Sequence, residues 1–180
     1  GHNLLPDMEC VPNHIYEGYP SISTIGKVDW ACHSKNNNEP GNPADDHPQD
    51  VATVLANWQE VMRTGLRLCS ESSHDGSMNH LQAFLDSIDA RGWRCDIIDL
   101  HCYWNQGQFD NLTNISNRYG KRPIWISEWV WGAWWSGQGI FHLVKDANDF
   151  SQRAQKALYD GTRPILEKLN SNPIVERYYY

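Results

Sequence analysis

Two glutamates, each at or just past the end of an expected strand, could act together as a catalytic pair. Glu39 lies in the segment Asn-Asn-Asn-Glu-Pro-Gly, and Glu128 closes the run Ile-Trp-Ile-Ser-Glu. Cleavage of a glycosidic bond needs two carboxyl groups, and a separation of about 5 Å is typical of the retaining mechanism. The competing interpretation is that Glu39 is a solvated loop carboxylate and that Glu128 is a structural one.

Tryptophans crowd the sequence around Glu128. Residues 121–135 contain five of the nine tryptophans of the chain. Because an indole ring offers a flat apolar surface to the face of a sugar ring, we expect Trp129 and Trp131 to form walls of a sugar-binding site. The later tryptophans of this stretch would belong to the same wall or to a lid. The alternative is a tryptophan-rich packing loop. Three of the four remaining tryptophans are expected in the core or scaffold: Trp30, Trp58 and Trp93.

The expected strand over residues 95–104 carries further candidates at its end. His101 and Tyr103 are two residues apart, so their side chains point to the same face of a strand. On the inner face they would reach the site and could donate hydrogen bonds to a carboxylate; otherwise they pack. Trp104 would be a sugar platform or a rim residue.

Other polar side chains also follow expected strands. Glu71 and His74, in the segment Cys-Ser-Glu-Ser-Ser-His-Asp, could contact substrate, and the alternative is a solvated loop. Asp7 and Glu9, at the end of the first expected strand, are further candidates for substrate contact.

The elements that would position these residues alternate between strand and helix along the chain. Long, chemically varied loops follow the strands, and short turns follow the helices. This asymmetry predicts a parallel α/β fold with function at the carboxyl ends of its strands. Expected strands cover residues 3–9, 27–34, 66–70, 95–104, 123–129 and 174–180, and expected helices cover 21–26, 51–64, 78–90, 110–119 and 147–169.

Two architectures share that asymmetry, the doubly wound open sheet and the (β/α)8 barrel. No Gly-x-Gly-x-x-Gly or phosphate-binding loop follows an expected strand, which weakens the nucleotide-binding open sheet. The expected strands fall short of the eight that a barrel needs, commonly in about 250 residues. An incomplete barrel and an open sheet both remain at this point.

The two glutamate motifs resemble those of a known group. Asn38-Glu39-Pro40 after one strand and Ile126-Ser127-Glu128 after a later one are similar to the catalytic pair of the clan A (β/α)8 glycoside hydrolases. With the strand from Asp99 to Trp104 between them, the chain more closely resembles the glycosyl hydrolase catalytic core group, which includes family 128 β-1,3-glucanases.

The resemblance implies a TIM barrel in which the Asn-Glu-Pro strand is the fourth and the Ser-Glu strand is the seventh. Strands three to eight would then be present, in a single catalytic domain over residues 1–180 that is a fragment of a full barrel. Open sheet edges in such a fragment could pair with another chain.

The same resemblance implies a retaining glycosidase that cleaves O-glycosidic bonds in an oligo- or polysaccharide, with β-1,3-glucan as the suggested substrate. Glu39 would be the general acid/base and Glu128 the nucleophile of a double displacement, and Asn38 would donate to the sugar 2-hydroxyl. The alternative function is a carbohydrate-binding module or a degenerate barrel without turnover. Such a protein would keep the tryptophan wall and need only one of the two glutamates.

Composition argues against several other classes. The net charge is −7 without a cluster of Lys and Arg, so neither nucleic acid nor an anionic membrane surface is expected as a partner. No apolar stretch approaches 18 residues, so no transmembrane helix is expected. His-Glu-x-x-His and Gly-x-Ser-x-Gly are absent, which argues against a metal or serine hydrolase, and we expect no cofactor.

The five cysteines are scattered without a Cys-x-x-Cys pair, so a zinc site is not expected. Cys32, Cys69 and Cys102 lie in expected strands and should be small buried side chains. The expected location is extracytoplasmic: secreted, periplasmic or at the cell surface.

Overall fold

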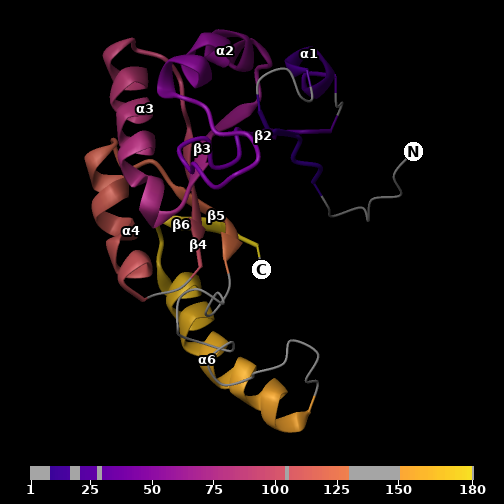
Figure 1. The fold of residues 1–180 in the computed structure, drawn as a ribbon, viewed down its shortest axis with the longest axis vertical. Helices are drawn as coiled ribbons and strands as arrows, with labels where there is room; N and C mark the ends of the chain where they lie inside the picture. Colours follow the sequence, from indigo (N-terminus) through magenta and orange to yellow (C-terminus); the bar gives the residue numbers. More distant parts are fainter. Residues whose placement is uncertain (1–8, 17–20, 28–29, 104–105, 130–150, 180) are drawn as a thin grey trace. The chain divides into compact units, whose positions relative to one another are not determined.

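The computed structural model describes residues 9–16, 21–27, 30–103, 106–129 and 151–179 (Figure 1). The chain divides into two compact units, Gly1–Asp99 and Leu100–Tyr180. Strand β4 (Ile97–Cys102) contains the boundary between them. None of the helices in the described ranges is long and apolar enough to cross a membrane.

In the first unit, neighbouring strands are parallel and are joined by helices. Strands β1, β2, β3 and β4 follow one another in this order, and the pairs β1–β2 and β2–β3 are parallel. The elements are β1 (Asn13–His14), α1 (Ile22–Ile25), β2 (His33–Asn36), α2 (Val51–Arg63), β3 (Arg67–Ser73), the 3-10 turn η1 (Asp75–Ser77) and α3 (Met78–Ala90), followed by β4.

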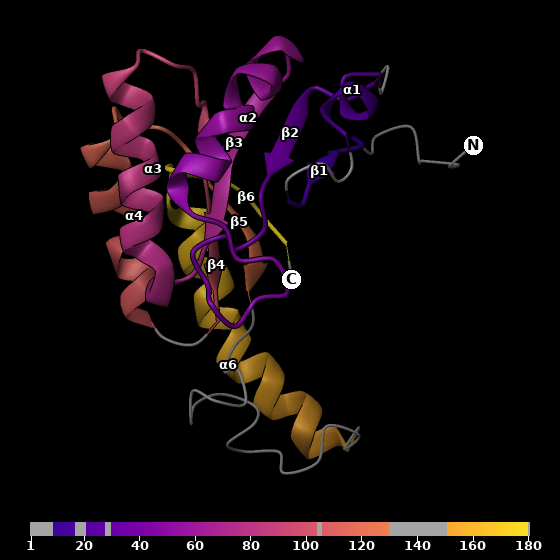
Figure 2. The same cartoon turned by 45° about the horizontal axis from the view of Figure 1, so that its top comes forward.

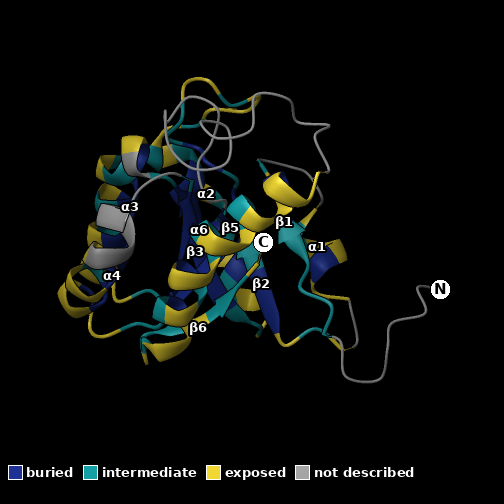
Figure 3. Cartoon of the chain, turned by 90° about the horizontal axis from the view of Figure 1, so that it is seen from below, coloured by how far each residue is buried: buried dark blue, intermediate teal, exposed yellow. Residues whose placement is uncertain are grey.

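The core of the first unit lies where α2 and α3 pack together (Figure 2). Trp58 of α2 is fully buried and meets the ring of Phe84 of α3 edge-on at 4.8 Å between centroids. Its indole N–H donates to the carbonyl oxygen of Arg94 at 2.9 Å, so the buried polar atom is satisfied. Strand β3 is buried along almost its whole length, as its dark blue colour in Figure 3 shows.

The second unit contains the end of β4, α4 (Gln106–Arg118), β5 (Ile124–Trp129), α6 (Gln152–Ser171) and β6 (Val175–Tyr178). Strands β5 and β6 are parallel, and the register between them is irregular at Ile124 and Trp125. Three consecutive residues of β5, from Ile124 to Ile126, are fully buried. A continuous apolar run is typical of a strand covered on both faces.

The helix predictions are confirmed where a local signal marked the ends. Helix α3 spans the predicted residues 78–90, and α2 ends one residue before the predicted 64. Asp50 caps α2, because its carboxylate accepts from the backbone N–H of Thr53 at 2.8 Å.

One strand prediction is wrong in its bounds, and another is not tested. Residues 3–8 of the first predicted strand, over 3–9, lie outside the described residues, and the first described strand is β1, further along the chain. The second prediction, over 27–34, gives way to β2 at His33–Asn36. Cys32, expected to be buried in that strand, is exposed and precedes β2. Trp30, expected in the core or scaffold, is 58% exposed.

The second strand was placed too early because β2 buries polar side chains. Asn36 is buried because its side-chain N–H donates to the carbonyl oxygen of Cys69 at 2.8 Å. Hydrogen bonds of this kind leave no apolar pattern in the sequence. Strand β3 likewise continues past the predicted end at residue 70, through polar residues as far as Ser73, so Glu71 lies in the strand and not in a loop.

Candidate functional site

Glu128 is the next-to-last residue of β5, and residues at the end of β4 are its polar neighbours. The hydroxyl of Tyr103 donates a hydrogen bond to Glu128 Oε2, and His101 Nδ1 lies 3.7 Å from the same oxygen. The His101 side chain is fully buried, whereas the Glu128 side chain is 44% exposed. The carboxylate is therefore held from one side and open to solvent on another. These three residues are called the Glu128 cluster below.

The expectation that His101 and Tyr103 share one face is confirmed. Their rings meet edge-on at 6.0 Å between centroids, with an interplanar angle of 89°, and both approach Glu128. A hydroxyl and an imidazole beside a carboxylate can stabilise its negative charge and fix its rotamer.

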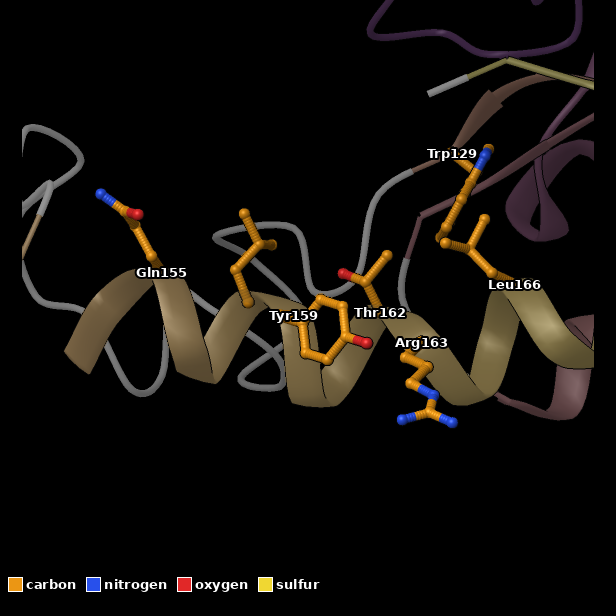
Figure 4. A pocket seen from close by; sticks show the side chains of 7 residues that line it. Trp129, Gln155, Tyr159, Thr162, Arg163 and Leu166 are labelled. Carbon is orange, nitrogen blue, oxygen red and sulfur yellow. The ribbon is translucent and has the colours of Figure 1, made fainter. Parts of the chain in front are cut away.

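Trp129 packs inside the second unit. It is 3% exposed, and its ring meets that of Tyr178 at 6.2 Å. It also lines an apolar pocket of about 540 Å³ beside α6, shown in Figure 4, whose other lining residues are Gln155, Leu158, Tyr159, Thr162, Arg163 and Leu166. Its role as the wall of a sugar subsite stays a prediction. Trp104 and Trp131 lie outside the described residues.

Glu39 belongs to the first unit and lies on the loop after β2. It is 8% exposed, and its Oε2 accepts a hydrogen bond from the side-chain amide of Asn42 at 2.7 Å. Asn38 is joined to Ser72 by an isolated parallel bridge, which ties this loop to β3. The side-chain amide of Asn38 donates to Asp45 at 3.3 Å. Glu39, Asn38 and Asn42 are called the Glu39 cluster below.

The backbone at the Glu39 cluster is strained. Asn37 and Glu39 have φ angles of 55° and 40°, in the left-handed region. Such a conformation costs a non-glycine residue about 1 kcal/mol or more and persists only where surrounding contacts impose it. Here Ser72 N–H donates to the carbonyl oxygen of Asn37 at 2.9 Å, and the Asn37 side chain donates to Gln49 at 3.1 Å. Strain of this kind is common at functional sites.

A buried acid–base pair lies behind the loop that carries Glu39. Glu71 of β3 is fully buried, and its Oε1 is 2.7 Å from His80 Nδ1. Burial raises the pKa of Glu71, although the hydrogen bond and charge of His80 oppose this rise. Burial also opposes protonation of His80, but the hydrogen bond and charge of Glu71, together with the Gln49 carbonyl and the charge of Asp50, outweigh it and raise the pKa of His80.

Glu71, a candidate for substrate contact, lies in β3 and not in a loop, and its contact with substrate stays a prediction. Its side chain has no exposed surface, because β3 extends past the predicted end and turns Glu71 toward His80. His74 is partly exposed, and its Nδ1 accepts from the backbone N–H of Gly76 at 3.0 Å. His74 keeps its place as a candidate.

Glu9, another candidate for substrate contact, pairs with His33 at 2.5 Å at the beginning of β2. The Glu9–His33 pair lies at the opposite end of β2 from Glu39, so we interpret it as a structural contact. Asp7 lies outside the described residues.

A largely buried charge network in the first unit was not predicted from the sequence. Lys35 Nζ of β2 lies 3.5 Å from Asp99 Oδ2 of β4, and Ser72 of β3 donates to the same oxygen at 2.8 Å. Three single polar residues far apart in the chain carry no local signal. Within the described ranges, no group of three or more His, Cys, Asp or Glu side chains is arranged to hold a metal ion.

Comparison with known proteins gives a family match over most of the chain. The family described as "Glycosyl hydrolase catalytic core" matches residues 24–180. No curated protein sequence matches the chain significantly.

Several solved structures share the fold at low sequence identity. A GH128 subgroup I endo-β-1,3-glucanase from Amycolatopsis mediterranei, in complex with laminaritriose, is 22% identical with a TM-score of 0.75, and the match covers 99% of this chain and 73% of that one. A GH128 subgroup III curdlan-specific exo-β-1,3-glucanase from Blastomyces gilchristii is 20% identical with a TM-score of 0.73, covering 99% and 75%. A GH128 subgroup VII oligosaccharide-binding protein from Trichoderma gamsii is 14% identical with a TM-score of 0.65, covering 90% and 62%.

These likenesses confirm the predicted fold class. The parallel strands and intervening helices are those of an α/β fold, and they correspond to part of the (β/α)8 barrel of the GH128 structures. Of the two architectures compatible with the sequence, the incomplete barrel is therefore the correct one.

Proposed function

Because the chain belongs to the glycosyl hydrolase catalytic core family, and is therefore a glycosidase, we propose that it is a retaining β-1,3-glucanase with Glu39 and Glu128 as its catalytic pair. The observation that carries the proposal is the environment of Glu128. A nucleophilic carboxylate has to remain ionised and correctly oriented, and Tyr103 and His101 approach the same oxygen of its carboxylate.

In the first step Glu128 attacks the anomeric carbon of the sugar. The bond from that carbon to the glycosidic oxygen breaks, and Glu39 gives its proton to the departing oxygen. A glycosyl ester on Glu128 results. In the second step Glu39, now a carboxylate, takes a proton from water. The water oxygen attacks the anomeric carbon, and the Glu128 carboxylate leaves. Two inversions restore the original anomeric configuration.

The choice of substrate rests on the similar proteins. Two of them are β-1,3-glucanases, one in complex with laminaritriose and one specific for curdlan. The third is an oligosaccharide-binding protein, so binding without turnover is the competing function.

Turnover separates the two functions. The chain should release reducing sugar from laminarin and curdlan and leave carboxymethyl cellulose and starch intact. Glu128→Gln and Glu39→Gln should abolish release while laminarin oligosaccharides still bind in calorimetry. Glu60→Gln, on the exposed side of α2, is the matched control and should behave as the wild type. Binding without release in the wild type would favour the sugar-binding function.

Stereochemistry tests the mechanism and the roles. Proton NMR of a fresh digest should show the β-anomer first, and an initial α-anomer would rule out retention. Azide should rescue Glu128→Ala with formation of an α-glycosyl azide, and Glu39→Ala with formation of a β-glycosyl azide. The reverse pattern would exchange the two roles.

We also propose an extracytoplasmic site of action, because long glucan substrates do not enter cells. Fractionation of the source cells, with activity on laminarin measured in each fraction, checks this. Recovery of the activity in the cytosol alone would contradict it.

A further inference from the structure

We propose that His80 is a positioning residue for Glu39, and that it acts through Gln49 on the loop between Asn37 and Gln49. The inference rests on the proposed role of Glu39 as the acid/base. His80 itself is on α3, and the contacts that carry the inference all lie within the first unit.

The His80 ring is hydrogen-bonded at both of its nitrogens. Its Nδ1 is 2.7 Å from the carboxylate of Glu71, and its Nε2 is 2.9 Å from the backbone carbonyl oxygen of Gln49. A carbonyl oxygen can only accept, so Nε2 carries a proton. The other hydrogen bond requires one more proton, located on Nδ1 or on Glu71. The ring is thereby fixed between a buried strand and the loop.

Gln49 is tied to both ends of the segment that carries Glu39. Its backbone N–H donates to the carbonyl oxygen of Pro40 at 2.9 Å, and its side-chain oxygen accepts from Asn37 at 3.1 Å. Pro40 and Asn37 are neighbours of Glu39 and Asn38 in sequence. Gln49 therefore closes the loop around the Glu39 cluster, and His80 holds Gln49.

Gly41 also approaches His80 closely, independently of these hydrogen bonds. A Cβ placed on Gly41 would lie 2.5 Å from Cβ and 2.7 Å from Cγ of His80. The loop passes directly against His80 two residues after Glu39, and the absence of a side chain at Gly41 permits this contact. His80 thus meets the loop at two points, one steric and one polar.

The backbone strain explains why such support is needed. Asn37 and Glu39 both adopt left-handed φ angles, which an unsupported loop would relax. When the loop relaxes, the carboxyl group of Glu39 moves. A displacement of about 1 Å from the productive geometry can lower a rate on the order of 100-fold.

Two substitutions separate the two ends of the ring. The amide N–H of His80→Asn takes the place of Nδ1, so it keeps the contact with Glu71 and loses the contact with Gln49. The amide N–H of His80→Gln takes the place of Nε2 and keeps the contact with Gln49. We expect His80→Asn to lower kcat on laminarin on the order of 100-fold with KM little changed, and His80→Gln to restore most of that loss. Asn79→Ala, exposed in the same turn of α3, is the matched control.

Hydrogen exchange gives a readout that does not depend on hydrolysis. The amides of Asn42 and Gln49, which donate to the carbonyl oxygens of Glu39 and Pro40, should exchange at least about tenfold faster in His80→Asn than in the wild type, and less so in His80→Gln. Glu71→Gln keeps the shape of the Glu71–His80 pair and should give an exchange rate between those of the wild type and His80→Asn. This variant replaces the His80 variants in the test if they do not fold.

Equal kcat and equal exchange rates in His80→Asn, Glu71→Gln and the wild type would overturn the proposal. So would equal losses in His80→Asn and His80→Gln, because these would show that the ring only fills space. An inactive wild type whose loop exchange still follows His80 would instead overturn the proposed function and leave the positioning of the loop established.

Discussion

The two candidate glutamates are held in different ways. Glu128 is part of strand β5, its side chain is 44% exposed, and the end of the adjacent strand β4 supplies Tyr103 and His101 directly. Glu39 is nearly buried on a strained loop, where Asn42 is a direct partner and the loop backbone is tied to the backbone of Ser72 and to the side chain of His80.

This difference matches the demands of the proposed steps. A nucleophile has one task, to attack with a fixed orientation, and a strand residue with two fixed neighbours suits it. An acid/base has to hold a proton, release it and accept another during each turnover. A loop supported by a network can be adjusted by several distant residues, at the cost of a strained backbone.

Substrates with an acidic leaving group give the largest expected difference between the roles of Glu39 and Glu128. On a dinitrophenyl β-laminarioligosaccharide, Glu39→Gln should still form the glycosyl enzyme, because departure of the phenolate needs no proton, and a burst of phenolate should follow. Glu128→Gln should lose on the order of 10⁴-fold or more in kcat on the same substrate, because no nucleophile remains. Stopped-flow absorbance measures both. A burst from Glu128→Gln would reverse the assignment.

Removal of one hydroxyl should weaken the Glu128 cluster alone. Tyr103→Phe deletes the donor to the carboxylate, and a hydrogen bond to a charged group contributes about 1.5–3 kcal/mol, so kcat should fall about 10- to 100-fold. Tyr178→Phe is the matched control, because its hydroxyl donates to Asn170 at the surface. Steady-state kinetics on laminarin decide this, and equal activity of the two variants would remove Tyr103 from the mechanism.

A methyl group added at Gly41 should disturb the loop that carries Glu39, because it would collide with His80. Gly41→Ala places a Cβ within 3 Å of two His80 atoms close to the backbone of α3, which cannot move away easily. We expect the free energy of unfolding to fall by about 1–3 kcal/mol, as for other overpacked sites.

Gly26→Ala is the matched control for that substitution. The nearest atoms to its new Cβ are at 3.6 and 3.9 Å, and its φ of −65° suits any residue. Urea denaturation compares the two variants. Equal midpoints would show that the loop yields to the methyl group without cost.

The smallest expected effect is a pH dependence of stability that belongs to the Glu71–His80 pair. Glu71 on β3 and Asp50 at the start of α2 are the acidic groups that act on His80. The folded state raises the pKa of both His80 and Glu71, so it binds the shared proton more tightly than the unfolded chain does. The contribution of His80 is present below its ordinary pKa of about 6.5 and is lost as the pH rises through the higher folded value.

The measurement is the difference in unfolding free energy between the wild type and His80→Asn from pH 6 to pH 9. This difference should shrink as the pH rises. A difference that stays constant or grows would show that the pair does not carry the proton.

The Glu128 cluster was largely predictable from the sequence. The strand of Glu128 is marked by a continuous apolar run, and the common face of His101 and Tyr103 follows from their spacing of two. Helices α2 and α3 were expected over 51–64 and 78–90, and their observed bounds differ from these by at most one residue. All of these signals lie within a few residues of the structure that they predict.

The surroundings of Glu39 were not predictable in the same way. The sequence identified Glu39 itself, but it placed β2 too early, ended β3 before Glu71 and gave His80 no role. A buried polar strand has no apolar alternation, and a hydrogen bond between residues 49 and 80 has no trace in either segment.

The sequence by itself determined the alternation of strands and helices and pointed to a glycosidase with Glu39 and Glu128 as candidate residues, because strand and helix periodicities and motifs are local properties of the chain. Tertiary structure alone decided that Glu71 is buried against His80, that Gln49 closes the loop of Glu39, and that Gly41 leaves room for His80. These features depend on which distant atoms come within hydrogen-bonding or contact distance, and folding sets those distances.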